Sequence, residues 1–270
     1  MKPDKRKKRK KKPEEYSRRV YRKLVTQADL VSTKVIIEET DLHILAEYDV
    51  TEQATDLILK YRAQLKNYIV KNPQFCASLN PLPVDIAALP LIRDMQNAGL
   101  LAEVGPMAAV AGAVAEYVGR ELVRLGCREI MVENGGDIFL QRTQDCKVAI
   151  FAGESPLSYK VGINIVSTQM PMGICTSSGT VGHSLSMGGA DSVTVLSKST
   201  PLADAVATRL GNEVGRVGDN REGIQKVLDI AGKIVGIIGV VVICGDIIGA
   251  SGDVELIKID LHEETGNEGR

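Results

Sequence analysis

The chain is 270 residues long, which is enough for one large domain or two closely packed ones. Apolar residues make up 44% of it, so it can form a sizeable core. With no Trp and only three Phe, that core must consist mainly of Val, Ile, Leu and Ala. Aromatic platforms for base stacking are therefore scarce, which weighs against a protein that binds single-stranded nucleic acid.

The charge is distributed unevenly along the chain. The net charge is −1, but residues 1–25 carry 13 Lys/Arg against 3 Asp/Glu, a net of +10, which leaves −11 on the rest. The eight consecutive basic residues from Lys5 to Lys12 predict a tail that stays disordered through self-repulsion. This tail either contacts nucleic acid or an anionic surface, or serves only solubility. No apolar stretch follows it, so a secretory signal is not indicated and we expect a cytoplasmic protein without membrane contact.

Beyond the tail, the sequence predicts a hairpin followed by two helices. Two short β-rich runs are separated by Glu39-Thr40-Asp41, which is typical of a hairpin. Thr51 is a suitable N-cap for a helix with 3.6-residue apolar spacing, and Pro-containing loops follow it. The predicted elements are strands at 34–38 and 42–48, and helices at 51–70 and 86–98.

A second long helix is predicted over residues 107–125. Pro106 lies at its first turn and Gly126 lies just past its end, which is the usual asymmetry of helix termini. The first half of this helix consists of Ala, Val and Gly, so it has no bulky face. We therefore expect something to pack very close to it, either a sheet or a flat ligand.

The next pattern is a pair of strands at 129–133 and 137–140 around Asn134-Gly135-Gly136. Asn-Gly is a strong signal for a two-residue hairpin turn. The alternative is that the two glycines let a ligand approach the backbone.

The remaining elements complete an α+β pattern. The stretch 234–244 is the most apolar of the chain, but it is too short to span a bilayer and favours a buried strand. Adjacent strands mixed with long helices predict an α+β fold with antiparallel sheets. We expect one domain over 26–262, between the basic tail at 1–25 and a flexible tail at 263–270. The further predicted elements are strands at 147–152, 159–166, 192–196 and 254–260, and helices at 201–214 and 225–231.

The stretch from Gly173 to Thr208 carries the strongest chemical signal. A small polar loop, Thr176-Ser177-Ser178-Gly179, is a plausible cradle for phosphate oxygens. Asp204 and Thr208 are four residues apart and share one face of the predicted helix. A carboxylate and a hydroxyl so placed can bind Mg²⁺, which prefers oxygen ligands.

Two other residues of this stretch have two readings each. His183 is either a surface histidine without a role, or a ligand contact or acid/base group that titrates near neutral pH. Asp191 either caps a turn or takes part in the site.

The five cysteines show no paired spacing, which indicates reduced thiols that fill core positions. Cys175 adjoins the polar loop and is the one candidate for a functional thiol.

Three features occur together in order: the glycine-bearing entry to the Ala-rich helix, Glu133-Asn-Gly-Gly-Asp137-Ile, and the block from Thr176 to Thr208. In this combination the chain resembles the ApbE superfamily, the FAD:protein FMN transferases once linked to thiamine synthesis, and within it an uncharacterised cytoplasmic ApbE-related branch. The resemblance covers most of residues 30–260. It implies an ApbE-like α+β fold.

The resemblance also implies a function and a set of site residues. Members of the transferase family cut FAD and attach its FMN half, through a phosphoester, to a Thr of an acceptor protein, with Mg²⁺ on the flavin phosphates. The implied metal ligands are Asp204 and Thr208, and the implied catalytic residues are His183 and Asp204. The implied flavin-binding residues are Gly135, Gly136, Asp137, Thr176, Ser177, Ser178 and Gly179. Between His183 and Asp191 the sequence differs from the transferase pattern, which has Asp-Pro and then Thr-Gly there.

Three hypotheses follow from the sequence. The first is an ApbE-like protein that binds FAD or FMN with Mg²⁺ and transfers FMN to a protein. The second is a non-catalytic ligand-binding protein, or one of sulfur assimilation to homocysteine, in which Cys175 would take part. The third, ranked last because the folded part is acidic, makes nucleic acid the partner of the basic tail. The apolar content is compatible with a homodimer.

Overall fold

The computed structural model describes residues 30–177, 190–214 and 220–259. Its main element is an eight-stranded sheet with the order β1-β2-β3-β4-β7-β8-β9-β10, in which every neighbouring pair is antiparallel. The strands are β1 (Val31–Ile37), β2 (Thr40–Ala46), β3 (Ile130–Asn134), β4 (Asp137–Gln141), β7 (Met172–Ser177), β8 (Ser192–Ser197), β9 (Ile237–Cys244) and β10 (Ile247–Gly252).

A second, three-stranded sheet and a set of helices complete the structure. The small sheet has the order β11-β6-β5 and is also antiparallel. Its strands are β5 (Cys146–Ala149), β6 (Val161–Ile165) and β11 (Glu255–Lys258). The α-helices are α1 (Thr51–Lys71), α2 (Gln74–Ala77), α3 (Pro90–Ala102), α4 (Val110–Arg124), α5 (Thr200–Glu213) and α6 (Asn220–Ala231), with short 3-10 turns at Pro106–Ala109 and Ser167–Gln169.

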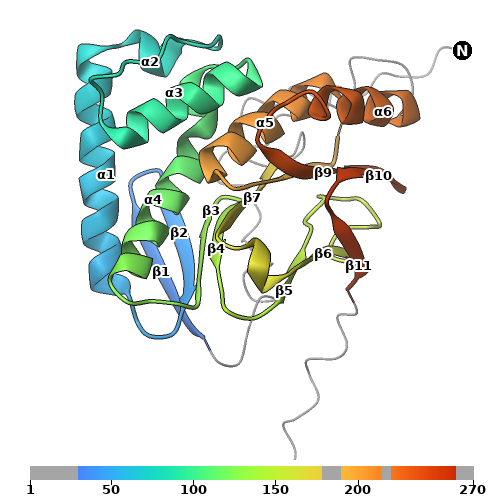
Figure 1. Ribbon diagram of the computed structural model, residues 1–270, viewed down its shortest axis with the longest axis horizontal. Helices are drawn as coiled ribbons and strands as arrows, with labels where there is room; N and C mark the ends of the chain where they lie inside the picture. Colours follow the sequence, from blue (N-terminus) through green and yellow to red (C-terminus); the bar gives the residue numbers. More distant parts are fainter. Residues whose placement is uncertain (1–29, 178–189, 215–219, 260–270) are drawn as a thin grey trace, which may run out of the picture.

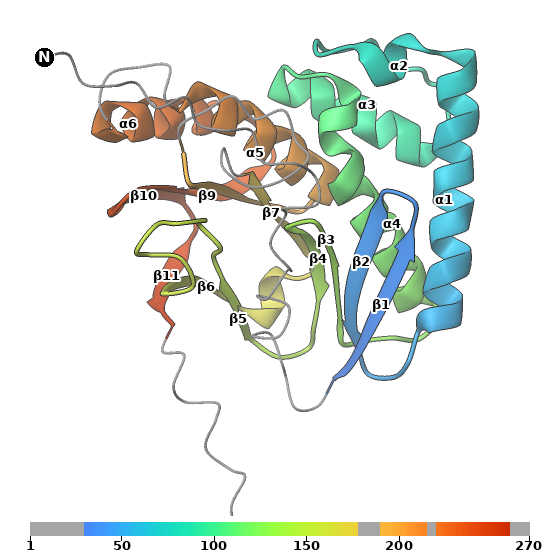
Figure 2. The ribbon, with the colours of Figure 1, turned by 180° about the vertical axis from the view of Figure 1, so that it is seen from behind.

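The large sheet is the middle layer, with the helices on one face and the small sheet on the other (Figures 1 and 2). Successive residues of β2 show this directly. Leu42, Ile44 and Ala46 belong to the core cluster on the helix side. Leu45, which lies between Ile44 and Ala46, belongs to the cluster on the small-sheet side. Because strand side chains alternate between faces, both faces of the sheet are covered by apolar contacts.

The predicted fold class, α+β with antiparallel sheets, is confirmed. The predicted hairpin is present as β1 and β2, and α1 and the long helix that starts at Pro106 match the predicted helices. The hairpin turn lies at Glu38 and Glu39 and not at residues 39–41, because Thr40 already pairs with Ile37 as the first residue of β2. The helix predicted from residue 86 begins at Pro90 instead, because Leu89 is extended and proline occupies the first helical turn. The single domain over 26–262 stays a prediction, and the predicted tails at 1–25 and 263–270 lie outside the described residues.

Two strands were missed by the sequence reading. Thr176 and Ser177 belong to the predicted loop 176–179, but in the structure they are the last two residues of β7. Strand β10 was also missed, because residues 247–252 contain two glycines and a serine and have little strand propensity of their own. Strand β10 forms because it pairs with β9 along its whole length.

The small residues of α4 allow close packing against protein. A Cβ on Gly112 would lie 2.6 Å from the backbone oxygen of Thr200, and one on Gly119 would lie 2.2 Å from the ring of Phe139. The elements that approach the helix closely at these two glycines are α5 and the sheet. The sequence left open whether a sheet or a flat ligand packs against this helix. The structure shows the sheet there, together with helix α5.

Within the described parts of the chain, no individual helix has the length and apolar character needed to cross a membrane; α3 taken together with 106–124 meets the test only across a bend of 107°.

Candidate functional site

The tip of the β3–β4 hairpin forms one side of the site. Gly135 and Gly136 have φ angles of 71° and 111°, and the flanking residues Asn134 and Asp137 pair directly. Positive φ at both central positions is what a tight two-residue hairpin turn requires, and glycine adopts it without strain. Gly136 also donates its N–H to Glu133 Oε1 at 2.8 Å. The turn explains both glycines, and it fixes Asp137 at the first position of β4.

The end of β7 lies beside this hairpin tip. Cys175 is the cross-strand neighbour of Asp137 and belongs to the core on the helix side. Alternation then directs Ser177 toward the helices and Thr176 toward the small sheet. The hydroxyl of Thr176 lies 3.0 Å from that of Thr194 on the next strand. The hydroxyl of Ser177 is buried and has no hydrogen-bond partner within the described residues.

The first turns of α4 and α5 meet at the same face of the sheet. Asp204 on α5 is 9% exposed, and its Oδ2 accepts the backbone N–H of Gly112 at 2.9 Å. Ala109, the residue before α4, supplies no side-chain cap, so the carboxylate of Asp204 takes that role from another helix. A side chain larger than hydrogen at Gly112 would collide with the Asp204 Cβ at 2.9 Å.

The same two helices make a reciprocal contact. Glu116 on α4 is buried, and its Oε2 accepts the backbone N–H of Thr200, the first residue of α5, at 2.7 Å. Its Oε1 pairs with Arg120 at 3.1 Å. Each helix thus contributes a carboxylate to the N-terminus of the other, where the helix dipole favours negative charge. These contacts fix the position of Asp204 relative to the sheet.

Burial raises the pKa values of two carboxyl groups at this site. Burial raises the pKa of Asp204 to about 7, although the N–H groups of Gly112 and Ala111 lower it in part. The pKa of Asp137 is raised well above its usual value, first by burial and then by the negative charge of Asp204. Buried carboxyl groups with raised pKa values are typical of a site that takes up a proton or a cation.

Cys175 is not suited to thiol chemistry in this environment. It is fully buried, and its thiol donates to the Thr200 carbonyl oxygen at 3.5 Å. Burial and the charges of Asp137 and Asp204 raise its pKa well above the usual range. Since the thiolate is the reactive form, the environment suppresses the nucleophile that the sulfur hypothesis requires.

The other predicted site residues fall into three cases. Thr208 lies one turn after Asp204 on α5 and is half-buried. Ser178, Gly179 and His183 lie outside the described residues. Asp191, for which turn capping was the simpler reading, accepts the N–H of Gly245 in the β9–β10 turn at 2.7 Å.

Some residues of the site were not found by sequence reasoning. Gly112 and Glu116 act through contacts between helices that are far apart in sequence, and a single sequence carries no signal for such contacts. The sequence indicates only a turn role for Asn134, but its side chain donates to the Ala111 carbonyl at 3.1 Å. It ties the hairpin tip to the first turn of α4.

Comparison with known proteins identifies the family. A sequence model of the family described as "AbpE bacteria" matches residues 22–248. The chain belongs to this family. Among AbpE relatives, the UPF0280 protein of Methanococcus aeolicus is 40% identical over 235 residues, 86% of this chain and 94% of that protein. The UPF0280 protein of Methanocaldococcus jannaschii is 40% identical over 231 residues, 84% of this chain and 93% of that one.

Solved structures confirm the ApbE-like fold. The flavin transferase ApbE from Vibrio cholerae has a TM-score of 0.52 at 14% identity, with 82% of this chain and 96% of that chain covered. The ApbE protein from Thermotoga maritima has a TM-score of 0.52 at 12% identity, with 82% and 97% covered. The resemblance to the ApbE superfamily is confirmed by family and by fold.

Proposed function

We propose that this AbpE protein binds a flavin nucleotide, FAD or FMN, through its phosphates and Mg²⁺, and transfers FMN from FAD to a protein hydroxyl. The observation that carries the proposal is the buried pair of Asp137 and Asp204, which meets the first turn of α4 at the end of β7. The Vibrio cholerae protein with the same fold is a flavin transferase, which supports the choice of nucleotide.

The residues present fit Mg²⁺. The described residues contain no group of three or more His, Cys, Asp or Glu that could hold a metal by itself. Mg²⁺ differs from zinc in this respect, because it is usually held by one or two carboxylates together with water and substrate phosphates. A buried pair of carboxyl groups whose pKa values are raised by burial is a suitable protein half of such a site. Asp204 and Thr208 would hold the ion, with Asp137 adding negative charge behind them.

Mg²⁺, when bound, would neutralise charge on the phosphates, which is the main requirement of phosphoryl-group transfer. The chain's own residues supply the positioning. Asp204 is held by the Gly112 N–H, so its carboxylate has one fixed orientation. The hydroxyl of Ser177, buried and unpaired among the described residues, is a hydrogen-bond donor available to a phosphate oxygen.

The hairpin tip adds backbone to the proposed phosphate site. Gly135 and Gly136 present a turn without side chains next to Asp137, so a ligand can approach closely. Thr176 contributes only its backbone on this face, because its side chain is directed to the other side of the sheet. Ser178, Gly179 and His183 complete the proposed set, with His183 as the acid/base group.

In the proposed reaction, the hydroxyl oxygen of an acceptor Thr forms a bond to the FMN phosphorus. The bond from that phosphorus to the oxygen bridging the two phosphates breaks, AMP leaves, and the hydroxyl proton passes to a base. His183 is the candidate for that base. The acceptor is therefore a protein with an accessible Thr.

Two measurements, made one after the other, test the proposal. Equilibrium dialysis of the purified protein against FAD, with Mg²⁺ or with a chelator, should show flavin retained only in the presence of Mg²⁺. Chromatography of the same mixture with a Thr-containing acceptor should then show AMP released and flavin attached to protein. No retained flavin would refute the binding site, and retained flavin without AMP would refute the transfer step alone.

A further inference from the structure

The first residue of α5, Thr200, is held by two other elements of the fold. Its backbone N–H donates to Glu116 Oε2 of α4 at 2.7 Å, and its carbonyl oxygen accepts the Cys175 thiol of β7 at 3.5 Å. A Cβ on Gly173 of β7 would lie 2.5 Å from the Thr200 Cα, so the strand and the helix are in direct backbone contact there. Helix α5 therefore starts at a fixed point between α4 and the sheet.

The two proposed Mg²⁺ ligands follow Thr200 at helical spacing. Asp204 and Thr208 lie one and two turns further along α5, on the same side of the helix as Thr200. The backbone hydrogen bonds of a helix hold its successive turns together. A displacement of α5 at Thr200 is therefore passed on to both ligands.

Glu116 makes the strongest of the contacts that hold this end of α5. It is 6% exposed, and it accepts an N–H group that has no partner within the helix. Hydrogen bonds to a charged acceptor are about twice as strong as neutral ones. The helix's own N-cap, Ser199, accepts the Leu202 N–H only at 3.4 Å, which is longer than a usual hydrogen bond. The side chain of Glu116 is in turn oriented by Arg120, at 3.1 Å from Oε1.

The fixed position of Asp204 matters for the choice of ion. Its Oδ2 accepts the Gly112 N–H, which leaves Oδ1 as the oxygen for a metal. Mg²⁺ suits such a site, because it takes single carboxylate oxygens at about 2.0–2.1 Å and keeps several waters. Ca²⁺ takes about six to eight oxygens at longer and more variable distances, and it often binds both oxygens of a carboxylate. A carboxylate that cannot turn or shift therefore disfavours Ca²⁺.

We propose that Glu116 is a positioning residue that sets the selectivity of this site for Mg²⁺ over Ca²⁺. The inference rests on the proposed function, because it takes Asp204 and Thr208 as the metal ligands. Glu116 acts through the backbone of Thr200 and does not touch the ion. Without its carboxylate the first turn of α5 loses its anchor on α4, both ligands gain freedom to move, and Ca²⁺ gains relative to Mg²⁺.

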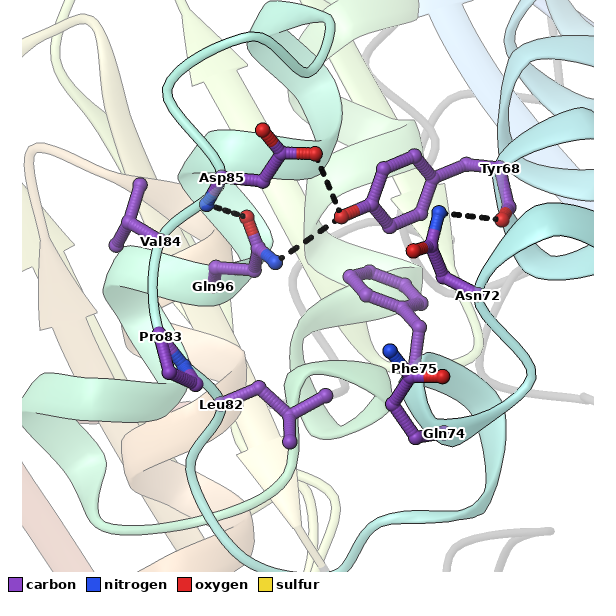
Figure 3. A pocket seen from close by; sticks show the side chains of 9 residues that line it. All are labelled: Tyr68, Asn72, Gln74, Phe75, Leu82, Pro83, Val84, Asp85 and Gln96. Atoms are coloured by element: carbon purple, nitrogen blue, oxygen red, sulfur yellow. Dashed lines mark hydrogen bonds between the residues drawn. The ribbon is translucent and has the colours of Figure 1, made fainter.

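Fluorescence titrations of FAD binding to the full chain, with Mg²⁺ or with Ca²⁺, test this inference. Glu116→Ala removes the acceptor of the Thr200 N–H, whereas Glu116→Gln keeps an oxygen in its place. The matched control is Gln96→Ala. Gln96 is also buried and also accepts a backbone N–H from another segment, that of Asp85 at 3.0 Å, but it lines a pocket to which α4 and α5 contribute no residue (Figure 3).

The measured quantity is the ratio of the half-saturating Ca²⁺ and Mg²⁺ concentrations. The wild type and Glu116→Gln should require more Ca²⁺ than Mg²⁺. Glu116→Ala should lower the ratio by about fivefold, the effect of a hydrogen bond of roughly 1 kcal/mol. Gln96→Ala should lower the urea midpoint and leave the ratio unchanged. In the metal-free protein, hydrogen exchange at the start of α5 should be faster in Glu116→Ala than in Gln96→Ala, which gives a readout independent of FAD.

Glu116→Asp keeps the charge but is one methylene shorter, and it should act like Glu116→Ala, so the test does not depend on one variant. An unchanged ratio in these two variants, or an equal fall in Gln96→Ala, would overturn the inference and leave the proposed function standing. A wild type that uses both ions equally well would also overturn it. Wild-type FAD binding that neither ion strengthens would refute the proposed metal site itself, and this inference with it.

Discussion

Gly112 donates its backbone N–H to the buried carboxylate of Asp204 at 2.9 Å, across 92 residues of sequence. The contact joins the first turn of α4 to α5, and it is possible only because position 112 has no side chain. It offsets in part the effect of burial, which raises the pKa of Asp204 to about 7. The central residue of the proposed site is thus positioned by a packing feature of the fold.

Replacement of Gly112 by Ala should reduce stability and impair flavin binding together. The added Cβ would lie 2.6 Å from the Thr200 carbonyl oxygen, so α4 and α5 must move apart at Asp204. We expect a loss of about 1–3 kcal/mol in the free energy of unfolding, as for other overpacked sites. Urea denaturation measures it. Gly232→Ala is the control, since a Cβ there meets nothing closer than 3.6 Å, and an equal loss there would refute the packing argument.

The stability of the metal-free protein should fall as the pH rises from about 4 toward 7. The Asp204 pKa is raised from 3.8 to about 7, so over this range the folded state holds a proton that the unfolded state has lost. This contribution is present in full below the unfolded pKa and disappears as the pH passes the folded one. The slope from one proton is at most about 1.4 kcal/mol per pH unit.

Asp204→Asn should remove the part of this pH dependence that comes from Asp204 and leave the part from Asp137, whose pKa burial also raises. The side-chain oxygen of the variant can still accept the Gly112 N–H, while the titrating charge is gone. Denaturation midpoints at a series of pH values, measured in the presence of a chelator, provide the comparison. A wild-type stability that rises over the same range would contradict the assignment of a raised pKa to Asp204.

Ser177 and Thr176 should respond differently to removal of their hydroxyls. Ser177 lies on the helix side of the sheet with an unpaired hydroxyl, and Ser177→Ala should weaken FAD binding about fivefold, the effect of a hydrogen bond of roughly 1 kcal/mol. Thr176 pairs with Thr194 on the opposite face, and Thr176→Ala should leave the affinity unchanged. Fluorescence titration of both variants measures this, and equal losses would show that the face assignment does not govern binding.

Cys175 should be unreactive in the folded protein. Its burial and the carboxylates beside it raise its pKa, so the thiolate is scarce and shielded. Alkylation at neutral pH followed by peptide mass spectrometry should find Cys175 unmodified in the native state and fully modified after unfolding. Rapid native labelling of Cys175 would restore the sulfur hypothesis.

The fold class and most elements could be predicted because they depend on local signals. The Asn134-Gly135-Gly136 turn and the Pro106 helix start are examples, since both follow from backbone preferences of the residues themselves. Strand β10 and the end of β7 could not be read in this way, because neighbouring strands impose their conformation.

The candidate site shows the same division. The spacing from Thr208 and the family resemblance both predict Asp204 as a site residue. Its partner Gly112 and the reciprocal residue Glu116 depend on how two helices cross, which no local pattern encodes. The opposite directions of Thr176 and Ser177 became clear only once both were seen to lie in a strand.

The central claim is that Asp204 links flavin nucleotide binding to Mg²⁺. Isothermal titration calorimetry of FAD into wild type and Asp204→Asn, each with Mg²⁺ and with a chelator, tests it most directly. We predict that Mg²⁺ strengthens FAD binding to the wild type by at least about tenfold, or roughly 1.4 kcal/mol, and has no effect on Asp204→Asn. An equal Mg²⁺ effect in both proteins, or none in the wild type, would contradict the account.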